Sequence, residues 1–156
     1  MPLEPRESDI PRIPGALRFY QVMAVITGVF LLLLVVEMIG AYGFGYHFIL
    51  NDANGFFYLA PGRIYGILQF ELLQPTSGID LSKYVLIVHG WLYVVYLIAS
   101  FRLWSFMRWP FGKLIVLALG GIIPVLSFIL EAIYTKQVRS WISSHPIAAP
   151  QEGASA

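Results

Sequence analysis

Three titratable side chains stand inside long apolar stretches of the sequence, and they are its first candidates for chemistry. Glu37 lies in the first stretch, His89 in the second and Glu131 in the third. A charged group at the centre of a bilayer costs about 2.5 to 3.5 kcal/mol on insertion scales, so each of the three needs a partner. A histidine held between two carboxylates can exchange protons near neutral pH. If the three side chains meet, they form a proton relay or an ion site.

A stripe of hydrogen-bonding side chains follows His89 along the same stretch. Tyr93 and Tyr96 recur after it at helical spacing, and lipid cannot satisfy their hydroxyl groups. We therefore predict a polar layer of Glu37, His89, Glu131, Tyr93 and Tyr96. Its role is either that of a proton relay or purely structural, with a carboxylate or tyrosine bonding the histidine and fixing helix packing. The same residue types could bind a divalent metal, but no Glu-x-x-His pair is present, and we expect neither metal nor cofactor.

Three apolar runs must position these groups. They cover residues 17–41, 84–104 and 113–134, and each is long enough to cross a hydrocarbon core about 30 Å thick. The short connection between the second and third runs predicts adjacent, antiparallel helices. Because successive helices alternate in direction, the three titratable groups should lie at a similar depth near one interface.

Small residues and a proline indicate where the helices touch or bend. The candidates for helix packing or a kink are Gly28, Gly90, Gly120, Gly121 and Pro124. Pro124 removes a backbone donor and crowds the carbonyl of Gly120, so we expect a kink in the third helix near Gly120-Gly121.

The composition is that of a membrane protein. Of the 156 residues, 58% are hydrophobic and only 12% are charged, against about 25% charged in soluble proteins. A net charge of +1 without a basic patch argues against nucleic-acid binding. The absence of cysteine excludes thiol catalysis and disulfides, and no nucleophile elbow or phosphate-binding glycine motif occurs. We therefore expect a protein that is not an enzyme.

The segment between the first two runs, residues 42–82, is aromatic and glycine-rich but too interrupted to span a membrane as one helix. Two interpretations stay open. One is an extramembrane loop with a short amphipathic helix at 62–74, bracketed by Pro61 and Pro75. The other is a re-entrant hairpin, which requires burial of its backbone in protein.

The predicted fold is therefore an all-α bundle of three transmembrane helices. The membrane domain covers residues 17–137, between disordered tails at 1–16 and 138–156. Positive charges set the orientation, and in this topology they divide six to four. That asymmetry predicts a cytoplasmic amino terminus and an outside carboxyl terminus.

The membrane region resembles the DUF3817 family of small bacterial integral membrane proteins, from about Leu17 to Tyr134. The resemblance rests on ITGVFLLLLVVEM in the first run, on VHGWLYVVY in the second, and on the segment from Pro124 to Glu131 in the third. Thr27-Gly28 stands where many members have Glu-Gly. The resemblance implies a three-helix protein of the bacterial cell membrane, and it brings no catalytic residues.

Two functions remain in view. The first is a non-enzymatic accessory or scaffold subunit of a larger bacterial membrane complex, because three helices bury a small core and an apolar loop would gain from a protein partner. The second is a small transporter or proton- or ion-handling oligomer that uses the Glu/His layer. The expected partners are the lipid bilayer and either other membrane proteins or further copies of the chain.

Overall fold

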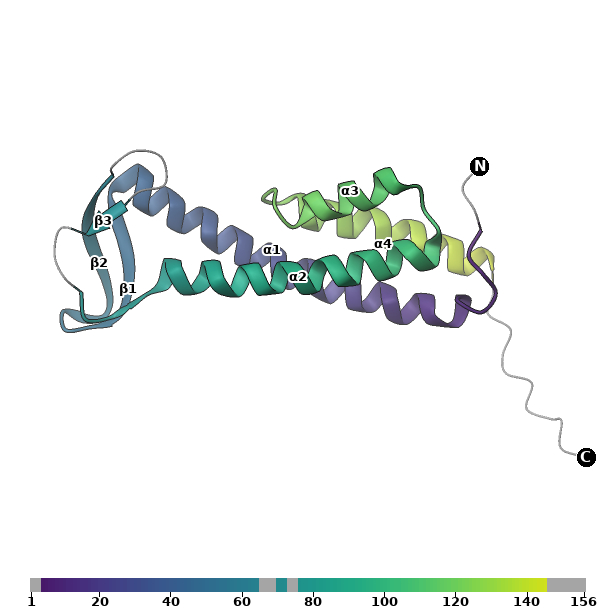
Figure 1. Ribbon diagram of the computed structural model, residues 1–156, viewed down its shortest axis with the longest axis horizontal. Helices are drawn as coiled ribbons and strands as arrows, with labels where there is room; N and C mark the ends of the chain where they lie inside the picture. The colour runs from purple at the N-terminus through teal and green to yellow at the C-terminus, as the bar shows by residue number, and fades with distance from the viewer. Residues whose placement is uncertain (1–3, 65–69, 73–75, 146–156) are drawn as a thin grey trace, which may run out of the picture.

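The molecule is built on two long antiparallel helices, which run along most of its length (Figure 1). The computed structural model describes residues 4–64, 70–72 and 76–145. The elements follow in the order η1 (Ile10–Arg12), α1 (Ile13–Met38), η2 (Ile39–Gly43), β1 (Tyr46–Asp52), β2 (Gly55–Ile64), β3 (Phe70–Leu72), β4 (Ile79–Asp80), α2 (Leu81–Met107), α3 (Phe111–Gly120) and α4 (Leu126–Ser144). The sheet lies at one end of the molecule, the sheet end; α1 begins and α4 ends at the other, the terminal end (Figure 1).

Among the described residues, two helices are long and apolar enough to cross a membrane, over 10–43 and 81–107. Only 33% and 22% of their most apolar windows are buried within the molecule, whereas the core helix of a soluble protein is mostly buried. Two helices could therefore span a membrane, which supports membrane association.

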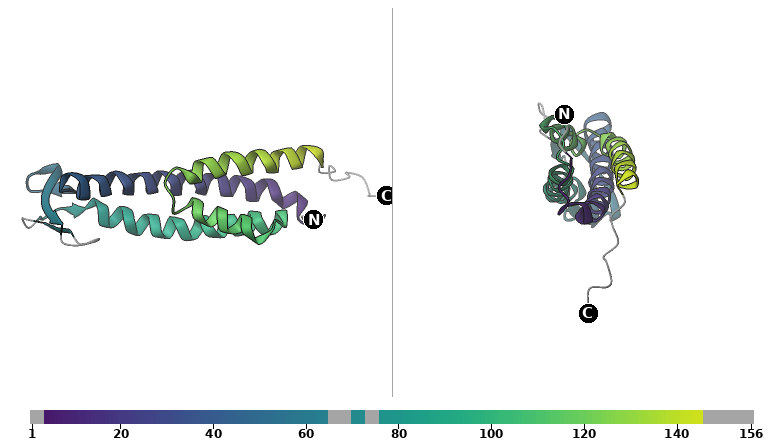
Figure 2. Two further views of the ribbon diagram at one scale, coloured as in Figure 1. Left: turned by 90° about the horizontal axis from the view of Figure 1, so that it is seen from above. Right: turned by 90° about the vertical axis from the view of Figure 1, so that its right-hand side faces the viewer.

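The predicted single third helix is wrong. α3 ends at Gly120, and α4 begins at Leu126 and runs back toward the terminal end. The two form a helical hairpin that covers only the half of α1 and α2 nearer that end (Figure 2). The 10 residues of α3 rise about 15 Å, which is half of a hydrocarbon core. The kink expected near Gly121 is in fact a reversal, because glycine ends helices readily and Pro124 cannot continue one.

The predicted all-α class is also wrong, because a four-stranded antiparallel sheet of order β3-β2-β1-β4 follows η2. Where the expected helix at 62–74 is described, it is strand: Gly62 of β2 pairs with Leu72 of β3. Residues 65–69 and 73–75 lie outside the described part. Aromatic and β-branched residues on both sides of Asn54-Gly55 explain the sheet, since Asn-Gly is a strong hairpin signal.

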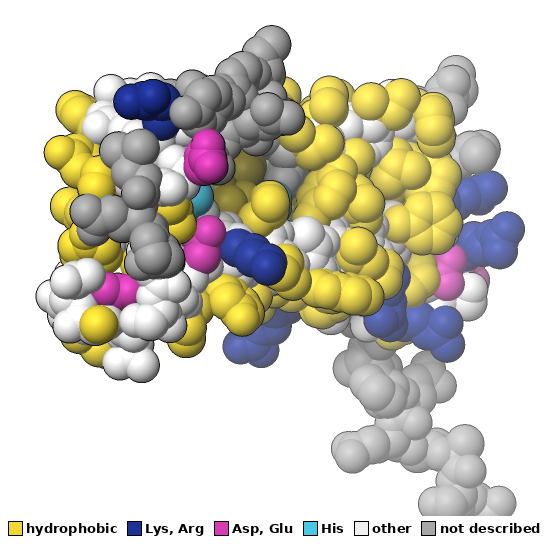
Figure 3. All heavy atoms as spheres, turned by 60° about the vertical axis from the view of Figure 1, so that its left-hand side comes forward, with side chains coloured by type: hydrophobic (Ala, Val, Ile, Leu, Met, Phe, Trp, Pro, Cys, Tyr) yellow, Lys and Arg dark blue, Asp and Glu magenta, His cyan; other side chains and the backbone are white. Residues whose placement is uncertain are grey.

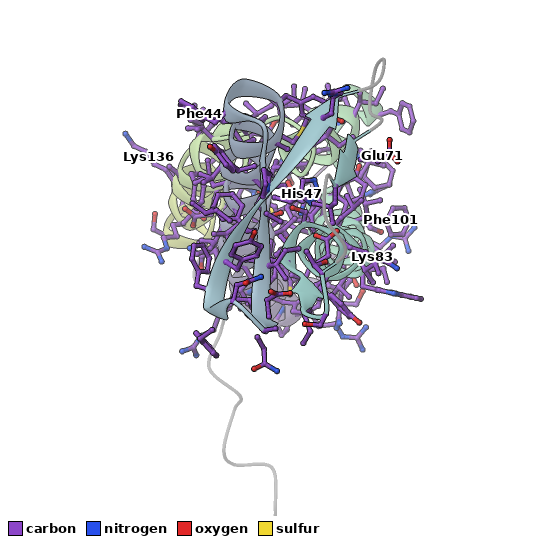
Figure 4. All side chains as sticks on the ribbon, turned by 90° about the vertical axis from the view of Figure 1, so that its left-hand side faces the viewer. Phe44, His47, Glu71, Lys83, Phe101 and Lys136 are labelled. Atoms are coloured by element: carbon purple, nitrogen blue, oxygen red, sulfur yellow. The ribbon has the colours of Figure 1, made fainter. Side chains whose placement is uncertain are left out.

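Two aspartates hold the segment that leads into α2 against the sheet. Asp52 accepts hydrogen bonds from the N–H groups of Asn54 at 3.0 Å and Ser77 at 2.9 Å. These bonds, led by that of Asn54, hold the pKa of the Asp52 carboxyl below its ordinary value. Asp80 caps α2, and its Oδ1 lies 3.5 Å from Nδ1 of His47, which Figure 4 shows near the middle of the sheet end. The sheet and α2 are thus joined by side chains as well as by the main chain.

The hydrophobic core lies in the half of the molecule where four helices meet. Its large buried side chains come from all four: Tyr20, Met23, Tyr96, Leu103, Leu117, Leu130, Tyr134 and Val138. Nearer the sheet, α1 and α2 have no further described helix beside them, and Leu86 and Trp91 are 60% and 72% exposed. The apolar surface of this two-helix half faces outward.

The helix ends also differ from the expected boundaries. α1 begins at Ile13, inside the tail expected at 1–16. α4 continues to Ser144, well into the tail expected at 138–156. Residues 1–3 and 146–156 lie outside the described part, so the outer portions of both tails remain predictions.

Candidate functional site

The break between α3 and α4 is the most unusual feature of the helical region, because it places non-helical backbone partway along α1 and α2. In lipid such backbone is tolerated only where protein satisfies its polar groups. The N–H of Gly121 donates to the carbonyl of Ala118, and those of Ile122 and Ile123 both donate to Leu119. These short-range hydrogen bonds thus satisfy part of the backbone at the end of α3.

Tyr93 and Tyr96 on α2 supply further hydrogen bonds to the end of α3. The Tyr96 hydroxyl donates to the carbonyl of Leu117 at 2.6 Å, and the Tyr93 hydroxyl donates to that of Ala118 at 3.2 Å. Tyr96 is fully buried, and its ring packs on that of Tyr20 with centroids 5.9 Å apart. The tyrosines of the stripe predicted along the second apolar run therefore donate hydrogen bonds to carbonyl groups at the end of α3.

Close packing around small residues holds the break in place. A Cβ built on Gly121 would lie 2.5 Å from Cδ2 of Tyr93, so only glycine fits without movement. A Cβ on Gly28 of α1 would lie 2.3 Å from Oγ of Ser127, in the first turn of α4. Gly90, by contrast, has nothing within 4 Å of such a Cβ, so it takes no part in helix contact.

Glu131 lies in the second turn of α4, five residues after the start of that helix. Its Oε1 accepts hydrogen bonds from Nε2 of Gln21 at 2.8 Å and from Oγ1 of Thr135 at 2.9 Å. Sequence reasoning missed Gln21, although an amide inside the first apolar run is itself a signal for a buried polar partner. The pair joins α4 to α1.

His89 and Glu37 lie at two other levels. The His89 ring stacks on that of Tyr93, with centroids 6.4 Å apart, beside the Thr27 backbone. Glu37 is buried beside Ser82, under the sheet. Among the described residues, no hydrogen bond or ion pair joins His89 to either predicted acid.

The predicted polar layer is therefore spread along the helices. At 1.5 Å per residue along α1, Glu37 lies about 15 Å from the level of Thr27 and His89. Glu131, beside Gln21, lies about 9 Å from that level on the other side. The depth argument assumed a third helix that crosses the membrane, whereas the reversal carries Glu131 back toward the terminal end.

Comparison with known proteins identifies a family. The model of the family described as "Domain of unknown function (DUF3817)" matches residues 17–136, which include most of α1, the sheet, α2, α3 and the first half of α4. No solved structure matches the chain significantly.

The relatives are mycobacterial. An uncharacterized protein of Mycobacterium leprae (strain TN) is 34% identical over 73 residues, which are 47% of this chain and 61% of that protein. An uncharacterized protein of Mycobacterium tuberculosis (strain ATCC 25618 / H37Rv) is 28% identical over 131 residues, which are 84% of this chain and 82% of that protein. Since the family model covers most of the chain, the chain belongs to the DUF3817 family.

Proposed function

We propose that the protein is a non-enzymatic accessory subunit that binds another membrane protein through the surface of its sheet end. The observation that carries this proposal is a group of exposed apolar side chains on and beside the sheet: Phe44, Tyr46, Phe56, Phe57, Leu59 and Ile79. Phe44 and Phe56 are 73% and 79% exposed, and Figure 4 shows Phe44 at the edge of the sheet end. Because side chains alternate along a strand, Phe57 and Leu59 lie on one face of β2 and Phe56 on the other. Large exposed apolar groups of this kind are typical of interaction sites.

The two-helix half next to the sheet supports the same proposal. Leu86 and Trp91 of α2 and Val36 of α1 are more than half exposed there. Figure 3 shows hydrophobic side chains gathered over the helices, whereas acidic and basic side chains stand among those of the sheet end in the same view. A partner helix lying beside α1 and α2 could therefore contact the sheet as well.

The alternative, a small transporter or ion-handling oligomer, has weaker support. Broken helices often line transport sites near the middle of a bilayer. Here the tyrosine hydroxyls of α2 bond the carbonyls at the break, and the three titratable groups lie at separate levels. A helix break whose carbonyl groups are already hydrogen-bonded within the molecule fits an accessory subunit better than it fits a transport site.

Replacement of Phe44, Phe56 and Phe57 together by serine should release the partner without unfolding the chain. We expect the wild-type protein, purified from its own membranes in mild detergent, to carry a second membrane protein in constant proportion. The triple variant should be recovered without it and with an unchanged unfolding temperature. Phe111→Ser, at an exposed position of the terminal end, is the matched control and should keep the partner.

Two results would contradict this proposal. One is wild-type protein that is purified without any second protein. The other is a triple variant that retains the partner as fully as the control does.

For the orientation, we propose that both termini face the cytoplasm and the sheet faces outward. The start of α1 and the end of α4 lie at the same end of the molecule (Figure 1). Eight of the 10 positive side chains belong to that end: Arg6, Arg12, Arg18, Arg102, Arg108, Lys113, Lys136 and Arg139. Arg63 and Lys83 belong to the sheet end. An eight-to-two division favours this orientation more strongly than the six-to-four division expected from three spans.

Single cysteines should report this orientation cleanly, because the chain contains no cysteine. We expect Ala53→Cys, in the β1–β2 turn, to react with a membrane-impermeant maleimide on intact cells. Ser143→Cys, near the end of α4, should react only after the membrane is permeabilised. Labelling of Ser143→Cys from outside would show that the chain crosses the membrane a third time.

A further inference from the structure

A cleft of about 320 Å³ opens at the terminal end, between the chain that precedes α1 and the last turn of α2. Its walls are formed by Arg6, Asp9, Trp104, Ser105, Arg108 and Trp109. Tryptophan is enriched at membrane interfaces, where one side of the indole is apolar and the other is wet. The cleft therefore lies at the level where lipid headgroups meet the acyl chains.

The two arginines of this cleft are available to an anion. Nη1 of Arg108 donates to the carbonyl oxygen of Glu4 at 3.4 Å, a neutral acceptor. Within residues 4–64, 70–72 and 76–145, neither Arg108 nor Arg6 forms an ion pair with a carboxylate, although Asp9 lines the same cleft. A guanidinium group presents a planar fork of donors that matches two oxygens of a phosphate.

A further cation lies beside the cleft. Nζ of Lys113, at the start of α3, lies 4.6 Å from the centre of the Trp109 ring and 3.2 Å from Oε1 of Gln137. Both contacts leave its positive charge without a carboxylate partner. Three cations, Arg6, Arg108 and Lys113, thus lie at or beside the cleft, while Asp9 lines it and Glu4 and Glu7 belong to the same short segment.

The backbone of Arg108 supplies an independent observation. This residue ends α2 in the left-handed conformation, with φ 48° and ψ 39°. Glycine is the usual residue at such a position, because a Cβ is unfavourable there. A long cation in a strained conformation indicates that its side chain has a use at this place.

Two carbonyl groups in the last turn of α2 accept hydrogen bonds from the residues that follow the helix. The carbonyl of Ser105 accepts from the N–H of Arg108 at 3.3 Å, and that of Trp104 accepts from the N–H of Trp109 at 3.4 Å. The indole Nε1 of Trp104 donates to the carbonyl of Pro110 at 3.2 Å, which fixes the ring in the wall of the cleft.

From these contacts we propose that the cleft binds the phosphate of an anionic membrane lipid. Arg6 and Arg108 hold the phosphate oxygens, and the half-buried ring of Trp104 lies against the glycerol and the first methylene groups. Free phosphate offers the same anionic chemistry without the apolar part, so the test must separate the two sources. The proposal goes beyond the proposed accessory function and does not depend on any protein partner.

Arg108→Gly is the sharpest test, because it removes the cation and also relieves the backbone. Purified full-length protein in dodecyl maltoside would be titrated with phosphatidylglycerol, with phosphatidylcholine and with inorganic phosphate, while its unfolding temperature is recorded. We expect phosphatidylglycerol to raise the unfolding temperature of the wild type, and we expect about tenfold weaker binding by the variant, the loss of roughly one charged hydrogen bond. Without lipid, the variant should be at least as stable as the wild type.

Lys83→Gln, which removes a cation from the sheet end, is the matched control and should respond to phosphatidylglycerol as the wild type does. An equal response to inorganic phosphate that is also lost in Arg108→Gly would support the phosphate site and identify a soluble source. If Arg108→Gly and the wild type respond equally to phosphatidylglycerol, or if phosphatidylcholine acts as strongly, the proposal is overturned.

Discussion

Replacing Gly121 with alanine should destabilise the protein by about 1–3 kcal/mol, the usual cost of overpacking a well-packed site. The added Cβ would lie 2.5 Å and 2.6 Å from two atoms of the Tyr93 ring and 3.0 Å from Cδ1 of Tyr96. Both rings carry hydroxyl groups that bond α3, so moving them also weakens those hydrogen bonds. The effect can be measured by unfolding in sodium dodecyl sulfate, followed by the fluorescence of the 4 tryptophans.

Gly90→Ala is the matched control, because no atom lies within 4 Å of its added Cβ. This substitution should stabilise α2 by up to about 1 kcal/mol, since glycine is a poor helix former. The two glycine-to-alanine changes are thus expected to have opposite signs. Equal effects of the two would mean that the α3–α4 hairpin does not pack against α2 as described.

Tyr96→Phe should cost about 1–3 kcal/mol, because it leaves the carbonyl of Leu117 without its donor in a buried, apolar setting. Tyr93→Phe should cost less, since its hydrogen bond to Ala118 is longer, at 3.2 Å, and Tyr93 is only partly buried. Amide exchange in the last turn of α3 should become faster in both variants. The same unfolding assay supplies the free energies.

Tyr84→Phe provides the comparison for the loss of a hydroxyl group. Tyr84 is 55% exposed near the start of α2, and its substitution should change stability by less than about 0.5 kcal/mol. If Tyr96→Phe lowers stability no more than Tyr84→Phe does, water or another group must bond the carbonyl of Leu117. The proposed role of the Tyr96 hydroxyl in stabilising the helix break would then be wrong.

The two long helices were predictable because the evidence for them is local. A run of apolar residues with an arginine or lysine near its ends has few alternatives. The first predicted run is covered by α1 together with η2, and the second lies within α2. The third run was equally apolar, and Gly120, Gly121 and Pro124 indicated a disturbance within it. Whether such a disturbance bends a helix or reverses it depends on which groups donate hydrogen bonds to the backbone carbonyls that the break leaves free. Those partners, Tyr93 and Tyr96, lie on another helix, beyond the reach of local reasoning.

The sheet could have been recognised from Asn54-Gly55 and the aromatic residues around it. The spacing between Pro61 and Pro75 suited an amphipathic helix as well, and strand pairing between β2 and β3 depends on distant partners. The polar layer depended on topology in the same way. Once the third helix reverses, Glu131 meets Gln21, and an argument from depth alone no longer places it near Glu37.

The half-length hairpin of α3 and α4 also has a mechanical consequence for the bilayer. In the orientation proposed above, all four helices lie in the leaflet at the terminal end, whereas α1 and α2 alone continue into the leaflet at the sheet end (Figure 2). The molecule is therefore tapered, and lipid in the sheet-side leaflet must fill area that protein occupies on the other side. Bilayers deform to accommodate inclusions whose shape does not match them. Many copies in one region would thus impose a preferred bend on the membrane, with the terminal-end leaflet on the convex side.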